Sequence, residues 1–252
     1  MGLDPVSARL PATCRDSAEP FFAFNRALID ATADLVCAYK PQIAHYAAAG
    51  AEAELSATIR YINTNFPDIP VILDAKRGDI GSTAEKYALE AFERYQADAV
   101  TVNPYLGGDA LDPFLDYADK GVIILCRTSN PGGSDLQGLE TGGEALYLKV
   151  ARLAAAVWNR NRNILLVVGA TWPEELARVR EVVGGDVPLL VPGVGAQGGD
   201  LEAVLKAGLN QDRRGLVINS SRGIIYADSG TDFAAAARQA AAALREAINR
   251  YR

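Results

Sequence analysis

A short string of charged residues, Asp74-Ala-Lys76-Arg-Gly-Asp79, contains the residue types that can handle charge and protons. It follows the apolar run Val71–Leu73, which is typical of a buried strand. Because Asp74 and Lys76 are two residues apart on that strand, we expect them to point to the same face. Burying an acid and a base is costly unless they pair. The string alone is equally compatible with a reactive site and with a surface salt bridge followed by a helix cap.

Two further groups of residues favour the reactive site. Lys40 lies in the apolar stretch Leu35–Ile43 and would add a second cation. The segments Gly193–Gly199 and Ser221–Gly223 are rich in glycine, which lets backbone N–H groups approach an anion closely. Arg222 can in addition form a forked contact with phosphate oxygens. The alternative, two ordinary glycine turns with a solvated arginine, is the weaker interpretation because of where the segments fall in the predicted fold.

These residues are positioned by an alternation of strands and helices. Apolar runs without polar interruption indicate strands buried on both faces, as in a parallel sheet. We expect strands at Gly2–Leu3, Leu35–Ile43, Val71–Leu73, Ala99–Val102, Gly121–Cys126, Ile164–Val168, Val187–Val191 and Gly215–Ile218. Segments with helical periodicity lie between them, at Phe21–Asp34, Ala47–Asn63, Thr83–Tyr95, Ala110–Lys120, Gly143–Arg160, Pro173–Val183, Asp200–Ala207 and Phe233–Ile248.

About eight such alternations in 252 residues predict an α/β protein with a single-domain (β/α)₈ TIM barrel over residues 1–252. A doubly wound open sheet is the alternative, and the number of strands favours the barrel. Only Met1 to Leu3 precede Asp4, so the first strand is either naturally short or trimmed. In such a barrel the active site lies at the carboxyl ends of the strands, and phosphate often binds the loops after strands seven and eight.

Composition excludes several classes of function. The net charge of -6 argues against a general nucleic-acid binder and gives no reason to expect an anionic membrane surface as partner. Three widely spaced cysteines indicate neither disulfides nor a zinc site, and we expect a reducing, cytoplasmic setting without a secretory signal. With His45 as the sole histidine, a Ser–His–Asp hydrolase is not expected. Trp158 and Trp172 are expected to pack against the barrel exterior or a loop.

The motifs, taken in order, resemble those of the orotidine 5′-phosphate decarboxylase family, which carries out the last step of UMP biosynthesis. Asp74-Ala-Lys76-Arg-Gly-Asp79-Ile80 is similar to the family signature, and Gly2-Leu3-Asp4-Pro5 to the end of its first strand. Pro192-Gly193-Val194-Gly195-Ala196-Gln197-Gly198-Gly199 resembles its seventh loop and Ser221-Arg222-Gly223 its eighth. The resemblance extends from Asp4 to about Asp228, and Ser129-Asn130-Pro131-Gly132-Gly133 is similar to the longer bacterial subgroup.

The resemblance implies a role for each candidate residue. Lys76 would protonate C6 of the product, within a charge network formed by Lys40, Asp74, Lys76 and Asp79. Asp79 and Thr83 would come from the neighbouring subunit of a homodimer. Asp4 and Lys40 would hold ribose hydroxyls, Ser129 would contact the pyrimidine edge, and Asn103 would line the pocket near the base. Gln197 and Arg222 would hold the phosphate, together with the loop residues Pro192, Gly193 and Ser221.

Two other functions remain open from the residues. A related barrel decarboxylase acts on a keto-sugar phosphate with a magnesium ion, and this sequence has Lys40 where a further acidic ligand would be needed. A non-catalytic barrel that senses a nucleotide is the other. The preferred interpretation, decarboxylation of a nucleotide monophosphate, needs neither a cofactor nor a metal. Loop closure would then involve the stretches after strands five and seven.

Overall fold

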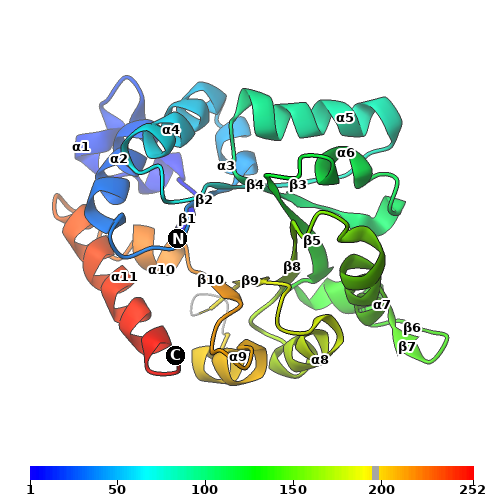
Figure 1. The fold of residues 1–252 in the computed structure, drawn as a ribbon. Helices are drawn as coiled ribbons and strands as arrows, with labels where there is room; N and C mark the ends of the chain where they lie inside the picture. Colours follow the sequence, from blue (N-terminus) through cyan, green and yellow to red (C-terminus); the bar gives the residue numbers. More distant parts are fainter. Residues whose placement is uncertain (195–198) are drawn as a thin grey trace. The chain divides into compact units, whose positions relative to one another are not determined.

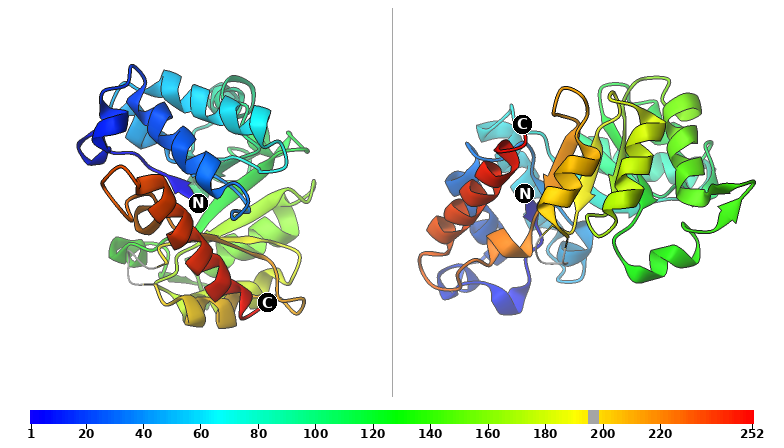
Figure 2. Two further views of the ribbon diagram at one scale, coloured as in Figure 1. Left: turned by 90° about the vertical axis from the view of Figure 1, so that its left-hand side faces the viewer. Right: turned by 90° about the horizontal axis from the view of Figure 1, so that it is seen from below.

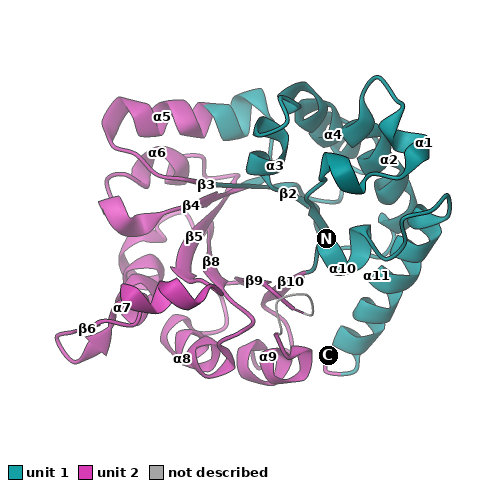
Figure 3. Cartoon of the chain, turned by 180° about the vertical axis from the view of Figure 1, so that it is seen from behind, with its two compact units in different colours: residues 1–75, 90–99, 220–250 teal, residues 76–89, 100–219, 251–252 magenta. Residues whose placement is uncertain are grey.

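The structure is a computed structural model that describes residues 1–194 and 199–252. Two compact units make up the chain (Figure 3). The first comprises residues 1–75, 90–99 and 220–250, and the second comprises residues 76–89, 100–219 and 251–252. Among the described residues, no helix has both the length and the apolar character that crossing a membrane requires.

The first unit consists of short strands surrounded by helices. Strand β1 (Gly2–Leu3) pairs in parallel with β2 (Lys40–Pro41), and Gln42 forms an isolated parallel bridge with Asp74 in β3 (Ile72–Arg77), a strand that continues into the second unit. The helices are η1 (Ser7–Arg9), α1 (Ala12–Arg15), α2 (Pro20–Thr32), α3 (Ile43–Ala47), α4 (Glu52–Asn65), η2 (Glu90–Arg94), α10 (Arg222–Ile225) and α11 (Phe233–Asn249).

Helices α2 and α11 form the main helical packing of this unit, and they lie side by side in Figure 2. The ring of Phe24 is fully buried and stacks on both Tyr226 and Phe233. At the surface, the Arg238 guanidinium donates to the carboxylate of Asp34 and holds the pKa of that carboxyl at about 2, well below its ordinary value. Aromatic packing and this ion pair therefore connect α2 and the turn that follows it to α11.

The second unit contains the larger group of strands (Figure 1). The sheet order is β10-β9-β8-β5-β4-β3, and the pairs β5–β8, β8–β9 and β9–β10 are parallel. Strands are β4 (Ala99–Val102), β5 (Gly121–Arg127), β8 (Ile164–Val168), β9 (Leu189–Pro192), β10 (Leu216–Asn219) and the antiparallel hairpin β6 (Glu140–Thr141) and β7 (Glu144–Ala145). Helices are α5 (Gly81–Leu89), η3 (Pro104–Leu106), α6 (Asp112–Leu115), η4 (Pro131–Asp135), α7 (Leu146–Leu153), η5 (Ala154–Trp158), α8 (Pro173–Val183) and α9 (Leu201–Gly208).

Local sequence explains why several helices begin and end where they do. Helix α8 starts at Pro173, whose fixed φ suits the first helical position, and it has Glu174 and Glu175 in its first turn, where the helix dipole favours negative charge. It ends at Val183, and the glycine that follows, Gly184, has a φ of 71°. Helix α9 is capped by Asp200, whose carboxylate accepts from the N–H of Glu202 at 2.9 Å. The predicted helix Pro173–Val183 is confirmed residue for residue.

The predicted strand Leu35–Ile43 is wrong in extent, because parallel pairing there covers only Tyr39 to Gln42, with isolated bridges at Tyr39 and Gln42 on either side of strand Lys40–Pro41. Leu35 still belongs to the turn after α2, since its N–H donates to the Thr32 carbonyl at 2.9 Å. Pro41 has no N–H to donate to the ladder, and pairing ends one residue later, at Gln42. Immediately after it, residues 43–47 form α3, which the sequence did not predict, and the helix expected at Ala47–Asn63 begins only at Glu52.

The predicted helix Ala110–Lys120 is also wrong in extent, because α6 covers only Asp112–Leu115. The side-chain amide of Asn163 explains the early end. It donates to the carbonyls of Leu115, Tyr117 and Lys120 at 3.1–3.2 Å. Because these carbonyls accept hydrogen bonds from a buried side chain that is distant in the sequence, the segment forms turns instead of a helix.

Candidate active site

Lys40 and Asp74 form a buried ion pair in the first unit. Lys40 Nζ lies 2.5 Å from Asp74 Oδ2, and the two residues are only 5% and 7% exposed. Strand β2 presents the lysine and strand β3 the aspartate, and the bridge between Gln42 and Asp74 holds these strands in register. Breaking such a pair is costly, because either charge would remain in a poorly solvated place. The pair provides one link of the predicted charge network.

Lys76 has a backbone conformation that is uncommon for a lysine. Its φ is 47°, in the left-handed region, which costs a residue with a Cβ about 1–2 kcal/mol relative to the right-handed helical region. The backbone N–H of Lys76 donates to Oγ1 of the buried Thr101 at 2.9 Å. Such backbone strain is concentrated at functional sites. The alternation argument that predicted the direction of Lys76 presupposes an extended backbone and does not apply here.

Asp79 and Thr83 lie at the start of α5. Asp79 is half-buried, and its Oδ1 accepts from the N–H of Ile80 at 2.8 Å. Thr83 is exposed in the first turn of the helix, with its N–H donating to the Ile80 carbonyl at 3.2 Å. Asn103 follows β4 and accepts from the N–H of Tyr105 at 3.0 Å through Oδ1. Its side-chain oxygen therefore serves as a helix cap, in addition to any role near a ligand.

Asp4 and Ser221 lie on the same side of Gly2. A Cβ added to Gly2 would be 3.0 Å from Ser221 Oγ and 3.3 Å from Asp4 Oδ2, so only glycine leaves both side chains in place. Asp4 Oδ1 and Ser221 Oγ are buried, and within the described part of the chain neither has a hydrogen-bond partner. Buried polar atoms normally have a partner, so these two oxygens are candidates for binding a polar ligand.

Two tyrosines hold the backbone on either side of Asp4. The Tyr46 hydroxyl donates to the carbonyl of Leu3 at 3.0 Å, and the Tyr226 hydroxyl accepts from the N–H of Val6 at 2.7 Å. Burial raises the pKa of both phenols, so they remain neutral at physiological pH. The conformation around Asp4 is therefore set before any ligand arrives.

The two predicted phosphate loops belong to different units. Pro192 ends β9 and accepts from the N–H of Ala170 at 2.9 Å, and Gly193 follows with a φ of 97°, which glycine adopts readily. Gln197 lies outside the described residues. In the first unit, Arg222 is the first residue of α10 and its side chain is exposed.

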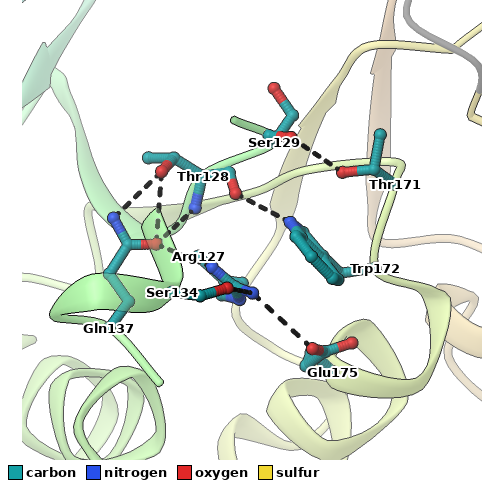
Figure 4. Close-up of polar contacts among 8 residues, drawn as sticks. All are labelled: Arg127, Thr128, Ser129, Ser134, Gln137, Thr171, Trp172 and Glu175. Carbon is teal, nitrogen blue, oxygen red and sulfur yellow. Dashed lines mark hydrogen bonds and ion pairs between the residues drawn. The ribbon is translucent and has the colours of Figure 1, made fainter. Parts of the chain in front are cut away.

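Side chains of the loop after β8 bind the backbone carbonyls of Ser129 and of its neighbour Thr128 (Figure 4). Its carbonyl accepts from Thr171 Oγ1 at 3.1 Å, and the neighbouring carbonyl of Thr128 accepts from Trp172 Nε1 at 2.9 Å. Sequence reasoning missed Trp172, which it placed on the barrel exterior or a loop without a role at the site. The one signal in the sequence for such a contact was Arg127, a charged residue at the end of an apolar strand. A buried charge requires partners, and Trp172 is one of them.

Comparison with known proteins identifies the family. Residues 13–240 match the family described as "Orotidine 5'-phosphate decarboxylase / HUMPS family". Proteins named orotidine 5′-phosphate decarboxylase from Dechloromonas aromatica (strain RCB) and Azoarcus sp. (strain BH72) are 64% and 63% identical to the chain, over 100% of its length and 93% of theirs. This chain belongs to that family.

Solved structures agree with this assignment. The structure of Leishmania donovani OMP decarboxylase is 43% identical and has a TM-score of 0.86, covering 99% of this chain and 92% of that one. Leishmania donovani UMP synthase is 45% identical with the same TM-score of 0.86, over 98% of this chain and 52% of that chain. The chain therefore has the (β/α)₈ barrel fold, and the fold class predicted from the alternation of strands and helices is confirmed.

Proposed function

We propose that this chain converts orotidine 5′-phosphate to UMP and CO₂ without a cofactor, with Lys76 as the proton donor. The observation that carries the activity is the full-length similarity to orotidine 5′-phosphate decarboxylases at up to 64% identity. Such relatives make the chain a carboxy-lyase of pyrimidine nucleotide synthesis. The roles of individual residues go further than this and rest on the local chemistry.

The reaction requires stabilisation of a negative charge on carbon. The bond between C6 and the carboxylate breaks, CO₂ leaves, and the electron pair stays at C6. An ammonium beside C6 attracts this charge as it develops and then transfers a proton to C6, which yields UMP and a neutral lysine that solvent reprotonates. Lys76 has the right chemistry for this step, and its left-handed backbone indicates that its position is imposed by its surroundings.

Lys40 and Asp74 would maintain the electrostatic setting of that step. Since the Asp74 carboxylate is already 2.5 Å from Lys40 Nζ, part of its negative charge is compensated. This favours a role in positioning the two lysines over one in repelling the substrate carboxylate. Asp79 would complete the alternating series of charges, so that the buried Lys40 and the exposed Lys76 would each have an anionic neighbour.

The remaining residues would bind the parts of the nucleotide that do not react. The unpartnered Asp4 Oδ1 supports a contact to a ribose hydroxyl, which Lys40 would share. Binding energy from the phosphate would assist desolvation and loop closure at the distant ring. The proposed contacts are Ser129 and Asn103 to the base, and Pro192, Gly193, Gln197, Ser221 and Arg222 to the phosphate.

We further propose a homodimer in which Asp79 and Thr83 reach the partner's site, and a cytoplasmic location. A single domain over residues 1–252 stays a prediction.

The dimer is tested by mixing inactive Lys76→Ala and Asp79→Ala proteins, since exchange would create heterodimers with one intact site. We expect partial activity after verified subunit exchange. No recovery after exchange would contradict the shared site.

The central test is the loss of orotidylate absorbance on adding the purified protein, with and without EDTA. We expect turnover that EDTA leaves unchanged, because no step proposed here uses a metal. Lys76→Ala should reduce turnover by several orders of magnitude while UMP binding remains measurable. Near-normal turnover by a folded Lys76→Ala protein would refute the proposed role of Lys76. Binding of UMP without any turnover by the wild type would instead indicate a nucleotide sensor.

A further inference from the structure

We propose that Gln137 and Trp172 are positioning residues that hold Ser129 in its base-contacting geometry before substrate binds. The proposal rests on the proposed function, in which Ser129 contacts the pyrimidine edge. It concerns the start of the loop after β5, where Thr128 and Ser129 are fixed by side chains from the segment that follows η4 and from the loop after β8 (Figure 4). The contacts all lie within the second unit.

The side chain of Gln137 binds the backbone N–H and the hydroxyl of Thr128. Its Oε1 accepts from the backbone N–H of Thr128 at 2.8 Å, and its Nε2 donates to Thr128 Oγ1 at 2.9 Å. Both functional groups of the amide therefore bind Thr128, and Oε1 also accepts from the Arg127 guanidinium at 3.4 Å. Gly133 makes this approach possible, because a Cβ there would be 2.8 Å from Thr128 Oγ1 and 3.0 Å from Gln137 Oε1.

Trp172 and Thr171 hold the carbonyl side of the same two residues. The indole N–H donates to the Thr128 carbonyl at 2.9 Å, and Thr171 Oγ1 donates to the Ser129 carbonyl at 3.1 Å. Gly169 packs directly against the backbone of Ser129, since a Cβ at position 169 would be 2.7 Å from both the Cα and the N of Ser129. The backbone of Ser129 thus lies against the backbone of Gly169, which blocks movement of the Ser129 Cα toward β8.

Arg127 connects the two sides. It is 2% exposed, and its guanidinium lies over the Trp172 ring at 4.1 Å from the ring centroid. It also donates to Ser134 Oγ at 2.9 Å and lies 3.7 Å from the Glu175 carboxylate. A buried, stacked cation of this kind fixes the ring plane of Trp172, and hence the direction of the indole N–H.

This arrangement has a consequence for recognition. Hydrogen bonds formed in the free protein remove the need to order the loop when the ligand binds, which is the usual gain from preorganisation. Loss of these bonds should therefore weaken contacts made through Ser129 and leave phosphate contacts unchanged. Ligands with and without the pyrimidine separate the two effects.

The test compares the dissociation constants of UMP and of ribose 5-phosphate, which has no base. Gln137→Met keeps the size of the side chain and removes the acceptor for Thr128 N–H, and Trp172→Phe keeps a ring beneath Arg127 and removes the indole donor. We expect each variant to weaken UMP binding about 5- to 20-fold, the usual cost of an unmade buried hydrogen bond. Ribose 5-phosphate should bind with an unchanged constant, which also shows that the variants are folded.

Gln137→Glu is the matched control, because its carboxylate still accepts from Thr128 N–H and faces the Arg127 cation. We expect it to restore most of the UMP affinity. A second control places Gln137→Met in a Ser129→Ala background, where its effect on UMP should largely disappear if it acts through Ser129.

Three results would overturn the proposal: unchanged UMP affinity in both variants, equal weakening of the two ligands, or a full effect of Gln137→Met in the Ser129→Ala background. If the wild type neither binds UMP nor decarboxylates orotidylate, the proposed function fails and this inference fails with it. If the wild type does both and the variants bind UMP normally, the positioning inference alone is wrong.

Discussion

The hydrogen bond from Lys76 N–H to Thr101 Oγ1 gives a direct test of how the lysine is positioned. Thr101→Val is nearly isosteric at a position that is 1% exposed, and it removes the acceptor that lies 2.9 Å from the Lys76 nitrogen. The left-handed backbone of Lys76 must be stabilised by its surroundings, and this bond is one contact that does so.

The expected magnitude follows from the cost of an unmade hydrogen bond. Leaving a buried donor without its acceptor costs about 1–3 kcal/mol, and the bond here is only partly buried, so we expect about 1–2 kcal/mol. If that energy favours another backbone conformation at Lys76, kcat should fall about 5- to 30-fold. UMP affinity should change by less than about twofold, since the lysine acts mainly on the charge that develops at C6.

The assay is the loss of orotidylate absorbance at saturating substrate, well below the unfolding temperature of each variant. Thr101→Ser is the control, because it keeps the hydroxyl acceptor and should retain most of the wild-type kcat. The reasoning is refuted if folded Thr101→Val has the wild-type kcat. It is refuted equally if Thr101→Ser loses as much activity as Thr101→Val.

Three other predictions concern binding and stability. Arg222→Ala should raise KM for orotidine 5′-phosphate at least tenfold with a smaller effect on kcat, and unchanged kinetics would remove Arg222 from the phosphate site. Lys40→Met should lower the free energy of unfolding by about 3–5 kcal/mol in chemical denaturation, because it leaves the Asp74 carboxylate without its buried cation; a loss under about 1 kcal/mol would contradict this. The Asp34 carboxyl, with its pKa lowered to about 2 by Arg238, contributes stability above pH 4 that is lost as the pH falls toward 2. Melting temperatures of wild type and Asp34→Asn should therefore differ at pH 6 and converge near pH 2, and a difference independent of pH would argue against the ion pair.

Much of the architecture was predictable because its signals are local. Strand Ile164–Val168 and helix Pro173–Val183 occur at the bounds that periodicity and end signals indicated. Elements controlled by distant partners were predicted poorly. Helix α6 ends early because Asn163 binds the carbonyls that follow it. Helix α3 arises at Ile43–Ala47, of which the predicted strand reached only Ile43 and the predicted helix only Ala47.

The candidate site divides in the same way. Which residue types follow each strand was evident from the sequence, because strand ends are marked by the change from apolar to polar residues. The sequence thus indicated Asp4, Lys40, Asp74, Lys76 and Ser129. Apart from Arg127, a charged residue at the end of an apolar strand, it gave no indication of how these side chains are held in place.

Amino-acid order by itself determined the alternation of strands and helices, the family, and the residues that carry charge. Tertiary structure alone decided that Lys76 adopts a left-handed backbone beside Thr101, and that Gln137 and Trp172 enclose Thr128. The physical reason is the separation along the chain over which each interaction acts. Apolar periodicity and capping act between residues only a few positions apart. A hydrogen bond between residues 44 positions apart depends on packing, which no local pattern encodes.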